Sequence, residues 1–437
     1  MLTSLKNAFK VKEIRQKLLF TLAMLVVIRL GSQLPVPGVD RTYFAQWFAA
    51  QTGGAFSFFD AITGGSFLNM SILALNISPY ITSSIIMQLL TIAIPYLEEM
   101  QRDGEDGRKK IASITRYVTV LLALIQAAAM AIGFGNQGLL VDYNALNVIT
   151  CIVALTAGSS FLMWIGERIT ENGVGNGTSI VLVINIISRL PQDLAQLFQQ
   201  FVIGKPYATA ILATVVIFAI IILMVVLVII LNAGVRKIPV QYAKKVQGRK
   251  MVGGQTSSIP LKVNTSGVIP VIFASSIMQT PIIISSLFGY SGTGAWAEVL
   301  KYLNSGNWCS PSQPIYSIGL VVYVLLVVFF AYFYTSITFN PMMVADNLKK
   351  QGGFIPGIRP GKPTSEYLNN VLNRIVFVGA VGLLIISVLP FVFQGVFNAS
   401  VSFAGTSLII IVSVILETMK QVESMMLVRN YKGFLND

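Results

Sequence analysis

The stretch SPYITSSIIMQLL, residues 78–90, has a near copy, IPVIFASSIMQTP, at residues 269–281. When Pro79 is aligned with Pro270, two Ile, a Ser, a Met and a Gln of the two stretches also coincide. Apolar segments share a small alphabet, so one such match also arises by chance. The proline and the glutamine in register favour a true internal repeat, with its copies a little under half of the 437 residues apart.

The composition around these two stretches is that of a membrane protein. Hydrophobic residues make up 54% of the chain, charged residues 11%, and the mean hydropathy is +0.72. Soluble domains carry about 25% charged residues, so a soluble protein this apolar would have too few charged residues to cover its surface. Lipid offers the backbone no hydrogen-bond partner, and the apolar runs are continuous rather than alternating. The sequence therefore predicts an all-α polytopic membrane protein.

Ten apolar runs approach the roughly 20 residues that a spanning helix needs. The predicted spans are Leu18–Leu34, Ile77–Leu97, Ile111–Phe134, Val148–Ile165, Ser179–Leu190, Ala208–Leu231, Val268–Leu287, Ile315–Phe339, Ile375–Phe393 and Ser402–Leu416. The division falls near GKPYAT, between residues 1–203 and residues 204–437, with five spans in each half. Because each half has an odd number of spans, the second half starts from the opposite side of the membrane and is inverted relative to the first. The two inverted pseudo-symmetric halves are expected to meet at an interface that holds the functional site.

Lysine and arginine set the expected orientation. If both termini are cytoplasmic, only five of the 31 basic residues lie outside. They are Arg29, Arg41, Arg189, Lys205 and Lys301, and the exterior acids are Asp40, Asp60, Asp142, Asp193 and Glu298. The net charge of +13 then belongs almost wholly to the cytoplasmic face.

The segment between the first two spans, GAFSFFDAITGGSFLNMSILALN (residues 54–76), is too apolar for an ordinary exterior loop. Gly64 and Gly65 interrupt it. Irregular backbone at membrane depth is tolerated where protein or a water-filled cavity surrounds it, so a re-entrant half-helix is expected. An interfacial amphipathic loop is the alternative reading.

Two cytoplasmic loops, at about residues 232–264 and 340–374, are longer than the topology requires. The first is basic and contains no acid, and Pro-Gly pairs restrict the second around Arg359. The positive-inside rule accounts for some of these charges. The remainder suits an RNA backbone or an acidic protein partner.

Chemistry-bearing residues are scarce. The chain has no His and no phosphate-binding G-x-x-x-x-G-K-[ST] motif, so no catalytic residue, metal or cofactor is expected. Cys151 and Cys309 are read as inert thiols, with a disulfide as the alternative. Uncharged polar residues, Asn76 and Asn185 among them, occur in or next to the predicted spans. They form either ordinary hydrogen bonds between helices or the weak bonds of a helix interface that opens.

Seven blocks resemble the bacterial SecY family, whose members are the large channel subunits of protein translocases. They are RLGSQLPVPGVD, SPYITSSIIMQLL, GEDGRKKIASITRY, FLMWIGERITENGVGNGTSI, LKVNTSGVIPVIFASSI, FNPMMVADNLKKQGGFIPGIRPG and AGTSLIIIVSVILE. The resemblance implies a non-enzymatic channel that passes unfolded secretory polypeptides across the bacterial cytoplasmic membrane. It also implies a lateral gate between the second and seventh spans, through which membrane segments leave into lipid.

The resemblance assigns four sets of residues. The pore ring is Ile81, Ile85, Leu182, Ile186, Ile272 and Ile410, with Leu182 where an Ile is typical. The lateral gate is Ser83, Ser84, Ile86, Gln88, Gln126, Ser275, Ser276, Met278 and Gln279. The plug, residues 54–76, includes Phe58, Phe59, Asp60, Ile62, Gly64, Gly65, Phe67 and Leu68. Partner contacts are Arg236, Lys237, Lys244, Lys245, Arg249, Lys250, Lys349, Lys350 and Arg359.

The partners implied by the resemblance are the small subunits SecE and SecG, the SecA ATPase, the ribosome with its RNA, signal sequences with nascent polypeptides, and membrane lipid. Two other readings stay open. A secondary transporter with inverted repeats needs a solute site and a coupling ion, and the predicted spans lack acids at mid-membrane. A structural scaffold needs neither a plug nor an apolar ring.

Overall fold

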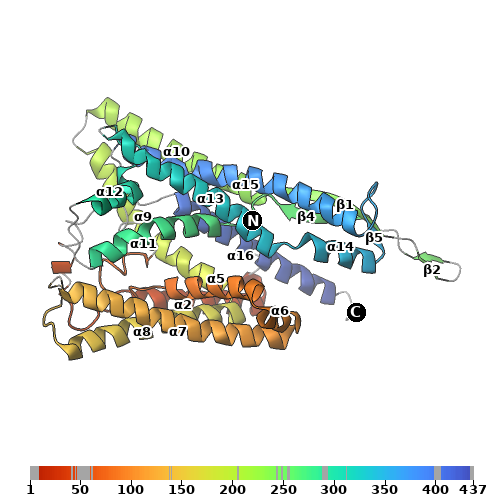
Figure 1. Ribbon diagram of the computed structural model, residues 1–437, viewed down its shortest axis with the longest axis horizontal. Helices are drawn as coiled ribbons and strands as arrows, with labels where there is room; N and C mark the ends of the chain where they lie inside the picture. The colour runs from red at the N-terminus through yellow and green to blue at the C-terminus, as the bar shows by residue number, and fades with distance from the viewer. Residues whose placement is uncertain are drawn as a thin grey trace.

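The computed structural model describes residues 9–40, 43–44, 46, 60, 63–136, 138, 140–203, 206–242, 245–247, 250–252, 256–287, 294–311, 313–397 and 405–433. Most of these residues are helical, and long helices run roughly along one axis of the molecule (Figure 1).

The first half of the chain forms a bundle. Its helices are α2 (Lys12–Gly31), α5 (Ser78–Ala93), α6 (Pro95–Arg102), α7 (Glu105–Asn136), α8 (Ala145–Asn172) and α9 (Gly177–Phe201). Helix α7 packs against α5 and α8, and α9 packs against α8. Asn176 begins α9 as its N-cap, because its side chain accepts hydrogen bonds from the backbone of Thr178 and Ser179.

The second half forms another group of helices, in the upper part of Figure 1. They are α10 (Tyr207–Ala233), α11 (Ile269–Leu287), α12 (Ala295–Leu303), α13 (Ile318–Thr338), α14 (Pro341–Lys350), α15 (Lys362–Phe397) and α16 (Gly405–Gly433), with short 3-10 turns η1 (Ser305–Asn307) and η2 (Pro314–Ser317). Helix α16 contacts both α9 and α10, and α11 contacts α7. The two repeated stretches both form helices, α5 and α11, with the proline near the start of each.

Six described helices are long and apolar enough to cross a membrane, or seven if a bent pair counts as one span. The bent pair is α5 and α6, which meet at an angle of 106°. The predicted span Ile77–Leu97 is therefore wrong at its end. Pro95 lacks an N–H group and disfavours helical backbone at Ile94, which is extended with φ −111° and ψ 111°.

Three other predicted spans correspond to helices α2, α11 and α16, which are not among the six long apolar helices. Helix α11 is shorter, its apolar part covering Ile269–Ile282. Helix α2 carries Arg15, Lys17 and Arg29, and α16 continues past its apolar start into charged residues. The total of ten spans thus stays a prediction.

Strands occur where the sequence predicted an all-α chain with loops, and this part of the prediction is wrong. Strand β1 (Val235–Tyr242) pairs antiparallel with β4 (Thr256–Lys262) and with β5 (Gly353–Phe354), and β2 (Lys245–Gln247) pairs with β3 (Lys250–Val252). In β1 the buried Ile238 and Val240 alternate with exposed residues, which is the two-residue period of a strand.

The two loops that the sequence predicts to be cytoplasmic form one packed unit, because β1 and β4 bury their apolar face against the second loop. Ile238, Val240 and Leu261 form a cluster with Leu348 of α14 and Leu368 of α15. These strands lie near α14 at one end of the long axis (Figure 1).

Candidate functional site

An apolar cluster forms where α5, α9, α11 and α16 converge. It includes the buried Leu182 and Ile186 of α9 and Ile410 of α16, and Ile81 of α5 and Ile272 of α11 pack against it. Five of the six residues assigned to the pore ring are thus brought together. Ile85 is buried but belongs to no described cluster with them.

The neighbouring face of α9 is polar, and it holds residues 63–77. The Asn185 side chain donates to Asn76 Oδ1 at 2.9 Å, and Arg29 donates to Asn185 Oδ1 at 3.5 Å. One turn further along, Arg189 forms ion pairs with Asp60 and with Asp193. Residues 185, 189 and 193 share a face because they are four apart.

Residues 64–70 and 72–77 form turns, and Ser71 bridges to Pro35. Most of the part before Gly64 lies outside the described residues, so the half-helix stays a prediction. Of the predicted plug residues, Asp60, Gly64 and Phe67 are buried, and Gly65 and Leu68 are half-buried. Phe67 packs edge-on against Phe44, with ring centroids 5.8 Å apart. Phe58, Phe59 and Ile62 lie outside the described residues.

Gly64 allows this segment to approach α9 closely. Its φ is +66°, and a Cβ atom there would lie 2.4 Å from the backbone oxygen of Asn185. Gly65 has a similar φ of +81°, but a Cβ atom would meet only an Arg189 side-chain nitrogen, 4.0 Å away. The two glycines therefore share the same backbone strain and differ in steric contact.

We expect Gly64→Ala to separate residues 63–77 from α9, since the clash is with backbone that cannot move aside. Hydrogen–deuterium exchange of the purified protein should rise in residues 63–77. Gly65→Ala is the matched control, because it has the strain of a positive φ without the clash. Equal exchange in the two variants would contradict this close approach.

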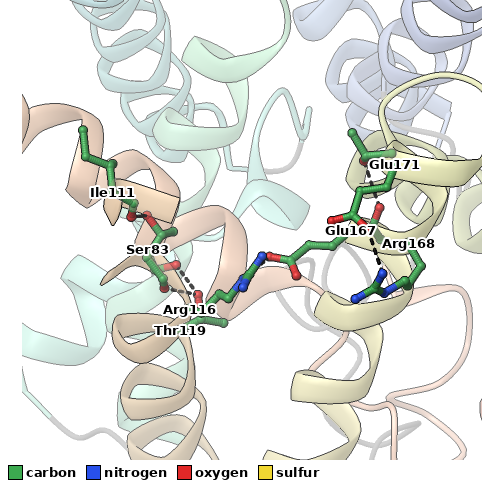
Figure 2. Close-up of polar contacts among 10 residues, drawn as sticks. Ser83, Ile111, Arg116, Thr119, Glu167, Arg168 and Glu171 are labelled. Atoms are coloured by element: carbon green, nitrogen blue, oxygen red, sulfur yellow. Dashed lines mark hydrogen bonds and ion pairs between the residues drawn. The ribbon is translucent and has the colours of Figure 1, made fainter. Parts of the chain in front are cut away.

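The residues assigned to the gate do not all face one seam. Ser83 is buried between α5 and α7, where its hydroxyl shares a hydrogen bond with Thr119 (Figure 2). Met278 is buried in a cluster with residues of α10, α13 and α15. Ser275 and Gln279 are buried, Ser84, Ile86 and Gln126 are half-buried, and Gln88 and Ser276 are exposed. Their role in a gate stays a prediction.

A charged contact joins α7 to α8 near Ser83. Arg116 Nε donates to Glu167 Oε1 at 2.7 Å, and Arg168 pairs with Glu171 within α8 at 2.8 Å (Figure 2). Both pairs are substantially exposed, so each contributes at most about 1 kcal/mol to stability. Thr119, Arg116 and Glu167 were not singled out from the sequence.

The basic surface lies on the strands and on the turn before α15. Arg236 and Lys237 of β1, Lys349 and Lys350 of α14, and Arg359 are exposed. Lys245 and Lys250 belong to β2 and β3, whereas Lys244 and Arg249 lie outside the described residues. These charges come from both of the loops at residues 232–264 and 340–374, which the strands bring into one unit.

Arg359 lies at the tip of a fixed turn. Gly357 and Gly361 have φ values of +83° and +102°, which side-chain-bearing residues rarely adopt. The Thr364 hydroxyl donates to the Arg359 carbonyl at 2.8 Å. The turn is therefore held through backbone groups, and the guanidinium is presented outward.

The two cysteines are not bonded to each other. Both are free thiols, Cys151 buried and Cys309 half-buried. Burial raises the pKa of the Cys309 thiol, which favours its unreactive protonated form. The disulfide alternative is therefore wrong.

Comparison with known proteins identifies the family. A SecY family model matches residues 71–419. The protein translocase subunit SecY of Streptomyces galbus is 44% identical over 454 aligned residues, which cover 100% of both chains. That of Bacillus subtilis strain 168 is 42% identical over 446 residues, again covering 100% of both.

Two solved structures share the fold. A protein-conducting channel matches with a TM-score of 0.61 at 18% identity, over 94% of this chain and 92% of that one. Sec61 in the canine ribosome-channel complex from the endoplasmic reticulum matches with a TM-score of 0.60 at 17% identity, with the same coverage.

The apolar helices and this architecture define a multi-pass membrane protein with the fold of protein-conducting channels. The chain belongs to the SecY family.

Proposed function

We propose that this chain is the channel subunit of a bacterial protein translocase, which passes unfolded secretory polypeptides across the cytoplasmic membrane. The observation that carries the proposal is the convergence of Ile81, Leu182, Ile186, Ile272 and Ile410 from four helices on one apolar cluster. The names of the curated relatives, translocase subunits, support it.

The chemistry of the cluster suits such a channel. A narrow ring of branched aliphatic side chains excludes water when it is closed and offers an ion no charge or ligand. The same side chains can flex around a polypeptide of any sequence. Asp60 and residues 63–77, held on the adjacent face of α9, would close the channel as a plug.

The proposed architecture has ten spans in two inverted halves, residues 1–203 and 204–437, with both termini cytoplasmic. The similar helices α5 and α11 would flank a lateral gate, through which transmembrane segments pass into lipid. Six long apolar helices and one bent pair among the described residues account for up to seven of these ten spans.

The proposed partners are SecE and SecG within the membrane and SecA or a ribosome at the cytoplasmic surface. The exposed Arg236, Lys237, Lys349, Lys350 and Arg359 offer a basic surface to acidic protein or RNA. We assign no catalytic step to the chain itself, so the partner would supply the energy for transport. Within the described residues, no structural feature favours the secondary transporter over this proposal.

A photocrosslinking experiment tests whether a translocating polypeptide passes through the apolar cluster. A photoreactive phenylalanine analogue placed at Ile186 should crosslink to a precursor arrested during translocation. Ile187 is the matched control, because it is adjacent on α9 but 37% exposed, whereas Ile186 is 3% exposed within the cluster. Equal crosslinking at both positions, or none at Ile186, would contradict a path through the cluster.

A further inference from the structure

Three ionisable side chains, two of α9 and one of the segment packed on it, are buried together outside the apolar cluster. Arg189 contacts Asp60 and, at 3.5 Å, Asp193. The side chains of Asp60, Arg189 and Asp193 are 0%, 11% and 4% exposed. Ionisable residues inside a membrane protein are costly to bury and commonly mark a functional site.

The two carboxylates have different origins. Asp193 is four residues after Arg189 on the same helix, so this pair is internal to α9. Asp60 comes from the segment that leads into residues 63–77. Of these two contacts of Arg189, only the one with Asp60 therefore has to break if that segment leaves α9.

Asp60 also organises the segment itself. Its Oδ1 atom accepts a hydrogen bond from the Leu68 backbone at 2.9 Å, and its carbonyl accepts from the Thr63 hydroxyl at 3.2 Å and the Gly65 backbone at 3.1 Å. One carboxylate thus connects the internal turns of residues 63–68 to the guanidinium of Arg189.

We propose that Arg189 is a positioning residue, which holds residues 63–77 in the closed position through Asp60 and turns to Asp193 when these residues leave α9. The proposal rests on the proposed channel function. The buried guanidinium keeps a carboxylate partner in both states, because Asp193 moves with it. Asp60 therefore favours the closed state, and Asp193 lowers the cost of opening.

The two carboxylates should then act in opposite directions. With Asp60→Asn, Arg189 keeps Asp193 and α9 stays intact, but the segment loses its charged contact. With Asp193→Asn, opening would leave a buried guanidinium without a partner, so the closed state is favoured. A merely structural triad would give both variants the same defect.

The experiment compares both variants with the wild type as assembled complexes. Asp60→Asn should raise the resting ion conductance in planar bilayers about tenfold or more, which corresponds to about 1.4 kcal/mol. It should also raise hydrogen–deuterium exchange in residues 63–77. Asp193→Asn should leave the ion conductance and the hydrogen–deuterium exchange at or below the wild-type level, and it should slow precursor translocation.

Two outcomes would overturn the proposal: unchanged exchange in residues 63–77 of Asp60→Asn, or the same increase in exchange and conductance in both variants. Hydrogen exchange does not depend on transport, so it decides the role of Arg189 by itself. If the wild type fails to translocate a precursor, the proposed function fails, and the exchange result still stands separately.

Discussion

Arg359→Glu should abolish precursor translocation while the chain remains folded in the membrane. Arg359 is exposed, and its turn is fixed by Gly357, Gly361 and the hydrogen bond from Thr364 to its carbonyl. None of these contacts uses the guanidinium, so the substitution changes the surface and not the fold. A planar guanidinium can bind a partner carboxylate in a two-pronged geometry, and a glutamate there repels it.

The measurement is translocation of a purified precursor by SecA with reconstituted complex. We expect a loss of at least about 30-fold, since an interface arginine at a hot spot contributes 2 kcal/mol or more. Arg359→Lys should recover little, because lysine keeps the charge but lacks the planar fork. Lys362→Glu is the control for a general charge effect, because Lys362 is exposed and lies only three residues after Arg359.

Assembly with SecE must be checked in the same preparation. Normal translocation by Arg359→Glu would refute the partner contact. Loss of assembly with SecE would move the role of Arg359 from partner binding to folding of the complex.

Replacing Ile81, Ile186 and Ile272 with Gly or Ser should make the resting channel conduct ions without any client polypeptide. Small or polar side chains admit water to the constriction that the branched aliphatic residues keep dry. Adding Ile85→Ser tests whether this buried residue, which lies apart from the cluster, contributes to the seal. The measurement is planar-bilayer conductance.

A buried isoleucine from the same cluster provides the control. Ile165 of α8 is 0% exposed and packs in that cluster, but it is not assigned to the ring. Truncating a buried isoleucine costs about 2–5 kcal/mol, so Ile165→Ser carries a comparable loss of stability. Conductance equal to wild type in the ring variants, or an equal leak from Ile165→Ser, would remove these residues from the seal.

The sequence predicted the membrane class and the position of most long helices, because continuous apolar runs are a strong pattern. The bend at Pro95 was missed although the proline itself predicts a break. The strands were missed because charged residues such as Arg236 and Lys237 mask the alternation of buried and exposed residues in β1.

The residues of the apolar cluster came from the resemblance, since each isoleucine alone is an ordinary helix residue. The structure brings five of them together, and their role as a seal stays a prediction. The ion pairs of Arg189 could not be predicted. The spacing of Arg189 and Asp193 indicates one helix face, but the contact with Asp60 joins distant parts of the chain.

The most direct test of the central claim is import into vesicles that contain the purified chain with SecE and SecG. With SecA and ATP present, a secretory precursor should become protected from added protease, and no protection should appear without the chain. Vesicles that instead take up a small solute in response to an ion gradient, and leave the precursor accessible to protease, would contradict a protein-conducting channel.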